Sequence, residues 1–210
     1  MQKEKKFDLW KMIGILYQPR ATFREIDNHP NWLLPLLGAI LFNVGYVFLF
    51  FNAGNVPVSG RMVLYTGYAA GVLLSVLICS GVFLLCLFLL GAQVTFKKVF
   101  SVVAHTYFLY TLINVVLGTL ILKASPDSSG IDPQNPVISN LGILVNPQLH
   151  PALYRLAISF DLFSIYFLIL TALGFSIISR KMSFKGSMGT VVAVWSFYVA
   201  AAVLIKAIVA

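Results

Sequence analysis

The chain has 210 residues and a formal net charge of +8; 59% of its residues are apolar and only 10% are charged. A soluble domain carries roughly 25% charged residues, so this chain cannot cover a folded surface with polar side chains, and the mean hydropathy of +0.89 agrees. These values exclude a soluble enzyme, a disordered regulator and a nucleic-acid binder. They predict an all-α polytopic membrane protein with its positive charge in loops beside anionic lipid.

The N-terminal segment is predicted to form short cytoplasmic or interfacial helices. The apolar side chains of the first helix fall near one face: Phe7, Trp10, Ile13 and Tyr17. Pro19 breaks the segment, and Thr22 and Glu25 have capping-box spacing, which predicts a second helix over 22–27 with Phe23 facing the membrane or the bundle. The segment either anchors the first span, the preferred interpretation, or docks a cytosolic partner.

A transmembrane domain over 32–210 is predicted to follow the N-terminal segment 1–31. Each of its five apolar runs reaches the ~20 residues that a helix needs to cross a ~30 Å hydrocarbon layer. The predicted spans are 32–51, 62–91, 99–122, 153–178 and 187–209. The long polar connection 123–152 is predicted as an external loop. Its apolar stretch 137–145 is too short to span, so it folds back, re-enters the membrane surface or caps the bundle.

The distribution of Lys and Arg predicts the orientation of the chain. Eleven lie on the side of the N-terminus: Lys3, Lys5, Lys6, Lys11, Arg20, Arg24, Lys97, Lys98, Arg180, Lys181 and Lys185. Four lie on the other side: Arg61, Lys123, Arg155 and Lys206. Because cytoplasmic loops carry the excess of positive charge, we expect a cytoplasmic N-terminus and an external C-terminus. The expected location is the cytoplasmic (inner) membrane, with an endoplasmic-reticulum or Golgi membrane as the alternative.

Three polar residues lie at similar depth in the predicted spans. Asp161 is the only acidic residue within them, and an aspartate at a helix centre costs about 2.5–3.5 kcal/mol on insertion scales. Counting the helical rise places Asn43 at about 16 Å, Asp161 at about 18 Å and Asn114 at about 22 Å from the inner edge. These three residues could form a substrate or ion site, or they could make hydrogen bonds between helices. The second interpretation is preferred.

The second predicted span contains a stripe of small residues. Gly67, Gly71, Ser75 and Cys79 recur every four residues, and the first two have GxxxG spacing. Such a stripe allows another backbone to approach closely. The preferred partner is another span of the same chain, and a second copy in a homo-oligomer is the alternative.

The motifs that carry catalysis or metal binding are absent from the sequence. It has no Gly-rich phosphate loop, no HExxH, no Cys–His cluster and no G-x-S-x-G turn. We therefore predict no enzymatic activity and no catalytic, cofactor-binding or metal-binding residues.

Four segments of the chain, taken in order and spacing, resemble a known family. They are PRATFREIDNHPNWLLPL (19–36), TFKKVFSVVAHTYF (95–108), ISFDLFSIYFLILTALGF (158–175) and SFKGSMGTVVAVW (183–195). Together they resemble the Ypt-interacting-protein (Yip) domain family over about residues 18–207. The residues at positions where the family looks similar are Pro19, Phe23, Lys97 and Asp161.

The resemblance implies five spans and a cytoplasmic N-terminus. It assigns no catalytic role to the four residues named above. Eukaryotic members act in Golgi and endoplasmic-reticulum trafficking, in membrane association with Rab GTPases and in membrane shaping. They usually carry a longer N-terminal region with a DLxGP-like motif, which does not precede Pro19 here. The resemblance therefore points to a bacterial or archaeal member.

The functional hypothesis is a non-enzymatic scaffold that organises membrane and binds a protein partner or anionic lipid at its cytoplasmic face. The candidate residues of that face are Lys11, Arg20, Phe23, Arg24, Lys97, Lys98, Arg180, Lys181 and Lys185. The alternative is a small transporter or permease subunit that uses the polar layer around Asn43, Asn114 and Asp161.

Overall fold

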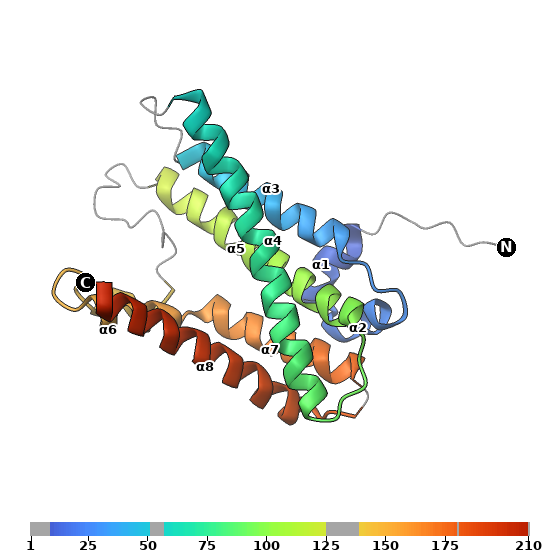
Figure 1. Cartoon of the computed structure of the whole chain (residues 1–210). Helices are drawn as coiled ribbons and strands as arrows, with labels where there is room; N and C mark the ends of the chain where they lie inside the picture. The colour runs from blue at the N-terminus through green and yellow to red at the C-terminus, as the bar shows by residue number, and fades with distance from the viewer. Residues whose placement is uncertain (1–8, 51–56, 125–138, 180, 210) are drawn as a thin grey trace.

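The computed structural model describes residues 9–50, 57–124, 139–179 and 181–209, and these residues are helical almost throughout (Figure 1). They form eight α-helices and one 3-10 helix. The elements are α1 (Leu9–Tyr17), α2 (Pro19–Asn28), α3 (Leu33–Phe50), α4 (Val58–Leu89), α5 (Phe96–Ala124), η2 (Leu141–Leu144), α6 (Pro151–Ser159), α7 (Leu162–Ile178) and α8 (Phe184–Val209). The predicted all-α fold is confirmed for the described residues.

Three helices in the described part of the chain are long and apolar enough to cross a membrane, namely α4, α5 and α8. They have 32, 29 and 26 residues. Two further apolar helices, α3 and α7, have 18 and 17 residues. At ~1.5 Å per residue each of these reaches about 25–27 Å, slightly less than a ~30 Å hydrocarbon layer.

The fourth predicted span is not one continuous helix. Residues 153–178 were expected to form a single rod, but α6 ends at Ser159 and α7 begins at Leu162. Between them Asp161 is extended, with φ −114° and ψ 142°, and caps α7 by accepting a hydrogen bond from the Ser164 amide. An N-cap aspartate favours a helix start over helix continuation. Both α6 and α7 pack against α8, so together they run along it.

The N-terminal helices pack into the bundle. Helix α2 begins at Pro19 instead of Thr22, because proline is well suited to the first helical position, where an amide would have no partner. The Thr22 hydroxyl donates to the carbonyl of Gln18 (3.1 Å), so Thr22 is not the N-cap. Helix α2 contacts α5 and α7, and the Tyr166 hydroxyl of α7 donates to the carbonyl of Leu16 (3.3 Å).

Helix α5 lies at the centre of the half of the bundle that holds α2. All residues from Val99 to Thr106 are buried, so this stretch has no face turned to lipid. The helix contacts α1, α2, α3, α4 and α7. A helix that is buried on all sides is expected in such a central position.

The turn from α4 to α5 depends on Gly91, whose φ of 76° lies in the left-handed region. The amide of Gly91 donates to the Phe88 carbonyl and the amide of Ala92 to the Leu87 carbonyl, both at 2.9 Å. This is the Schellman arrangement of a helix end. It returns the chain at once into α5 and places Lys97 and Lys98 in the first turn of that helix.

Close approach between helices occurs at glycines other than those of the predicted stripe. A Cβ on Gly174 would lie 2.5 Å from Val102 and 2.9 Å from Phe23, and one on Gly38 would lie 2.6 Å from Phe108. A Cβ on Gly67 or Gly71 would have no heavy atom of the described chain within 4 Å. The expected packing of Gly67, Gly71 and Ser75 against another span of the chain is therefore corrected, since all three are exposed.

Candidate functional site

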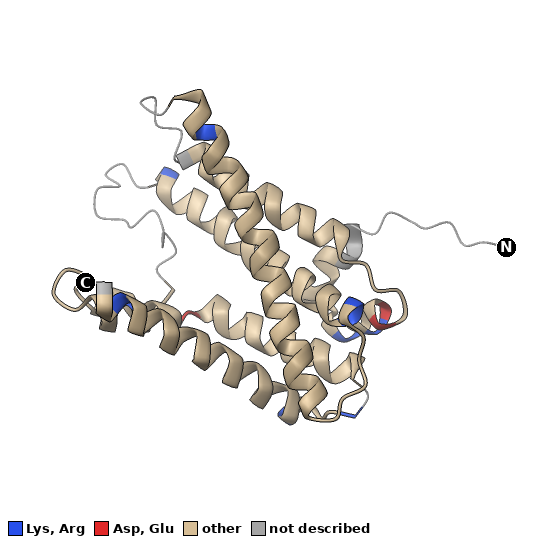
Figure 2. Ribbon diagram, viewed as in Figure 1, with Lys and Arg blue, Asp and Glu red and all other residues tan. Residues whose placement is uncertain are grey.

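Cationic residues lie at the end of the bundle formed by α2, the start of α5 and the start of α8 (Figure 2). Five of them are exposed there: Arg20, Arg24, Lys97, Lys181 and Lys185. Two other residues predicted for the cytoplasmic face are not covered: Arg180 lies outside the described residues, and the side chain of Lys11 is not described. We call the five exposed residues the basic end.

Lys98 is tied into the fold. Its ammonium group forms an ion pair with the carboxylate of Asp27, which joins α5 to α2. The Lys98 side chain is 27% exposed and that of Asp27 only 9%. Lys98 therefore fixes the position of α2 beside α5, and the neighbouring Lys97 is left as the exposed cation of this turn.

Phe23 was also named as a candidate residue of the cytoplasmic partner or lipid face, and its burial contradicts that role. Its side chain is 0% exposed and lies in the space that Gly174 of α7 leaves open. Ile26, one turn later, is also buried. The two apolar side chains face the bundle and anchor α2, because burying a phenylalanine or isoleucine stabilises by about 1.5–3 kcal/mol. Arg20 and Arg24 consequently point away from the bundle on the exposed face of α2.

Asp161 lies at the break between α6 and α7 and is buried. Its Oδ2 accepts hydrogen bonds from the amide (2.8 Å) and the hydroxyl (3.1 Å) of Ser164. Its Oδ1 accepts a hydrogen bond from the Ser139 hydroxyl. The Leu162 amide donates to the Ser139 carbonyl (3.4 Å), so Ser139, two residues before η2, is bonded to the break. The carboxylate thus has donors from two segments.

The partners of Asp161 were missed from the sequence, although one left a signal. Ser164 follows Asp161 by three residues, which is the spacing of an N-cap and its partner amide. That spacing could have indicated a helix start inside the apolar run. Ser139 lies far away in a polar connection and left no such signal.

The other two members of the predicted polar layer bond mainly to their own helices. The Asn43 amide donates to the Ala39 carbonyl (2.9 Å) and to the Thr111 hydroxyl of α5 (3.4 Å). The Asn114 amide donates to the Tyr110 carbonyl (2.9 Å). In the described part of the chain, no hydrogen bond joins Asn43, Asn114 and Asp161 to one another.

A second group of buried polar residues lies on α5 and α7. His105 is 2% exposed, and its Nδ1 lies 2.7 Å from the Ser101 carbonyl oxygen. The Thr171 hydroxyl donates to that of Thr106 (3.3 Å) and to the Phe167 carbonyl (2.8 Å). These bonds satisfy polar groups inside the bundle. Across the four described ranges, no group of three or more His, Cys, Asp or Glu side chains could hold a metal ion.

Comparison with known protein families identifies a match over most of the chain. The family model described as the Yip1 domain matches residues 13–207, which is nearly the whole chain. No curated protein and no solved structure matches the chain. The family resemblance stated from the four sequence segments is confirmed by this match.

Proposed function

The chain belongs to the Yip1 domain family, and on that premise we propose that it is a non-enzymatic scaffold of the cytoplasmic membrane that binds an acidic partner at its basic end. That partner is anionic lipid or an acidic protein surface. The scaffold would hold membrane and partner together without changing either of them chemically.

We propose five crossings, by α3, α4, α5, the α6–α7 pair and α8. In support, α6 and α7 both pack along α8, and α3 packs along both α4 and α5. Five crossings place eleven of the fifteen Lys and Arg residues on the side of the N-terminus. The positive-inside rule then favours a cytoplasmic basic end and an external C-terminus.

The observation that carries the proposal is the fixed position of the exposed cations. Phe23 and the Asp27–Lys98 ion pair hold α2 against α7 and α5. Arg20 and Arg24 therefore stand on a helix whose place is set by the bundle, next to the elements that carry Lys97, Lys181 and Lys185. A preorganised set of cations loses less entropy on binding than a flexible tail and attracts anionic headgroups or carboxylates.

The experiment compares charge neutralisation at the two ends of the full-length chain. The triple variant Arg20→Gln, Arg24→Gln and Lys97→Gln removes charge from the basic end, and the control Arg155→Gln with Lys206→Gln removes it from the opposite side of the proposed membrane. After cross-linking in native membranes, we expect recurring protein or anionic-lipid adducts to fall several-fold in the triple variant only. Equal recovery from both variants, or no recurring adduct from the unaltered chain, would contradict the proposal.

The transporter alternative has less support from the arrangement of its proposed site. Asp161 accepts hydrogen bonds from Ser139 and Ser164, and a carboxylate with these donors has fewer lone pairs for a substrate or ion. We expect Asp161→Asn to leave ion flux into proteoliposomes at the level of lipid alone, as for the unaltered chain. Flux through the unaltered chain that this substitution abolishes would favour the transporter instead.

A further inference from the structure

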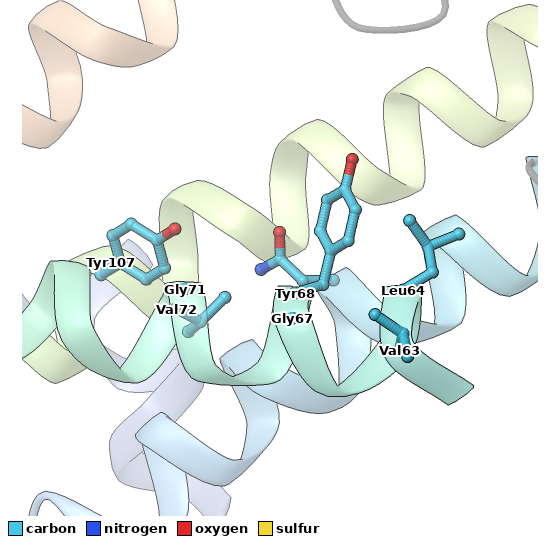
Figure 3. Close-up of a pocket in the computed structure, with 8 residues that line it drawn as sticks. Val63, Leu64, Gly67, Tyr68, Gly71, Val72 and Tyr107 are labelled. Atoms are coloured by element: carbon cyan, nitrogen blue, oxygen red, sulfur yellow. The ribbon is translucent and has the colours of Figure 1, made fainter. Parts of the chain in front are cut away.

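Helices α3, α4 and α5 form a groove of about 560 Å³ that is open along one side (Figure 3). One wall is the α4 stretch from Val63 to Val72, and Asn43 of α3 and Tyr107 of α5 line the other side. Figure 3 shows the ring of Tyr68 beside Gly67 and the ring of Tyr107 beside Gly71. The volume lies within the ~300–1,000 Å³ typical of ligand pockets.

The groove has the length of one membrane leaflet. From Val63 to Val72 the helix rises about 14 Å, which is close to half of a ~30 Å hydrocarbon layer. Four of the six α4 residues that line the groove are exposed, namely Val63, Gly67, Tyr68 and Gly71, whereas Leu64 is half-buried and Val72 is buried. Added Cβ atoms at Gly67 and Gly71 would contact nothing in the described chain, so the described helices leave this space unfilled.

Two cations lie on the groove's helices beyond its Val63 end. Arg61 lies two residues before Val63 on α4, and Lys123 lies in the last turn of α5. The start of α4 and the end of α5 lie at the same end of the bundle (Figure 1). None of α3, α4 and α5 contains an Asp or Glu residue. This end of the groove therefore complements a phosphate, which Arg and Lys bind by charge-assisted hydrogen bonds.

We propose that the groove holds one acyl chain of an anionic glycerophospholipid, with the phosphate of that lipid at Arg61 and Lys123. The lipid comes from the leaflet opposite the basic end. Its chain fills the concave wall between Val63 and Val72, where dispersion contacts would otherwise be lost. The site is separate from the basic end and does not depend on the function proposed for it.

The first test fills the groove. Full-length protein is reconstituted with phosphatidylglycerol or phosphatidylcholine, extracted in mild detergent and measured by native mass spectrometry. We expect Gly71→Leu to lower retained phosphatidylglycerol about tenfold, because the new side chain occupies the space of the acyl chain. The matched control is Gly81→Leu, also exposed on α4 with nothing within 4 Å of an added Cβ but outside the groove. It should retain lipid like the unaltered chain.

The second test removes the phosphate contact. Arg61→Gln should reduce the preference for phosphatidylglycerol over phosphatidylcholine several-fold, whereas Lys206→Gln, in the last turn of α8, should leave it unchanged. Thermal unfolding in the same detergent shows that each variant is folded. Equal lipid retention by the Gly71 and Gly81 variants would overturn the proposal. So would a lipid-free dimer that Gly71→Leu dissociates, because a second copy would then occupy the groove.

Discussion

The two ends of the bundle use glycine in opposite ways. At the end that holds α2, Gly174 and Gly38 admit side chains of neighbouring helices to distances that a Cβ would forbid. Toward the other end, Gly67 and Gly71 face open space, although their spacing is the familiar close-packing motif. In this chain the neighbours of a glycine, and not its spacing from another glycine, decide whether helices meet there. Three substitutions test this comparison, taken in order of decreasing expected effect.

The largest effect is expected from Gly174→Leu. Its side chain would enter space taken by Val102 and Phe23, and overpacking a core costs about 1–3 kcal/mol, sometimes more. We expect a loss near the top of that range in the free energy of unfolding, measured by denaturant titration in detergent. Gly71→Leu, at an exposed position, should change it by less than about 0.5 kcal/mol. Similar losses in both variants would remove the distinction between the two ends.

A smaller loss is expected from Lys98→Met. This substitution keeps most of the side-chain volume but leaves the buried carboxylate of Asp27 without its cation. A hydrogen bond to a charged group contributes about 1.5–3 kcal/mol, and the partial exposure of Lys98 favours the lower part of that range. The neighbouring exposed residue provides the control, since Lys97→Met should be close to neutral. Unfolding free energies of the two variants that coincide would show that the ion pair does not hold α2.

The smallest effect is expected at the opposite end, from Asp161→Ala. Loss of an N-cap costs about 0.5–2 kcal/mol, and asparagine caps nearly as well as aspartate. Asp161→Ala should therefore destabilise by about 1 kcal/mol more than Asp161→Asn. In the alanine variant, hydrogen exchange of the Ser164 amide should be faster than in the unaltered chain, because that amide donates a hydrogen bond to the Asp161 carboxylate. Unchanged exchange at Ser164 in the alanine variant would mean that the cap contributes nothing to this end of the molecule.

The helices themselves could be predicted because each apolar run is long enough to require one. The runs 62–91, 99–122 and 187–209 correspond to α4, α5 and α8 within a few residues at each end. The break before α7 could not be predicted from length or hydropathy, because Phe160 and Leu162 continue the apolar run on both sides of it. The predicted single helix is interrupted there because Asp161 caps the start of α7 instead of continuing a helix from α6.

The candidate site was predicted less well than the fold. Charge placed Arg20, Arg24, Lys97, Lys181 and Lys185 on one side of the membrane, and the structure shows these side chains exposed. The sequence left open whether Phe23 faces lipid or the bundle. Phe23 faces the bundle because Gly174, which is distant in the sequence, leaves space for its ring. Depths counted along straight rods also grouped Asn43, Asn114 and Asp161, whereas their hydrogen bonds lie in separate places.

The contacts of the N-terminal helices with α7 impose an order on biosynthesis. Leu16 and Tyr166, which share a hydrogen bond, are separated by 150 residues. At a synthesis rate of about 5–20 residues per second, the ribosome needs roughly 8–30 s to produce the second of them after the first. Until then α1 and α2 lack their contacts with α7. Their apolar surfaces must be covered by lipid, by a chaperone or by each other. The first helices therefore reach their final contacts only after α7 has been synthesised.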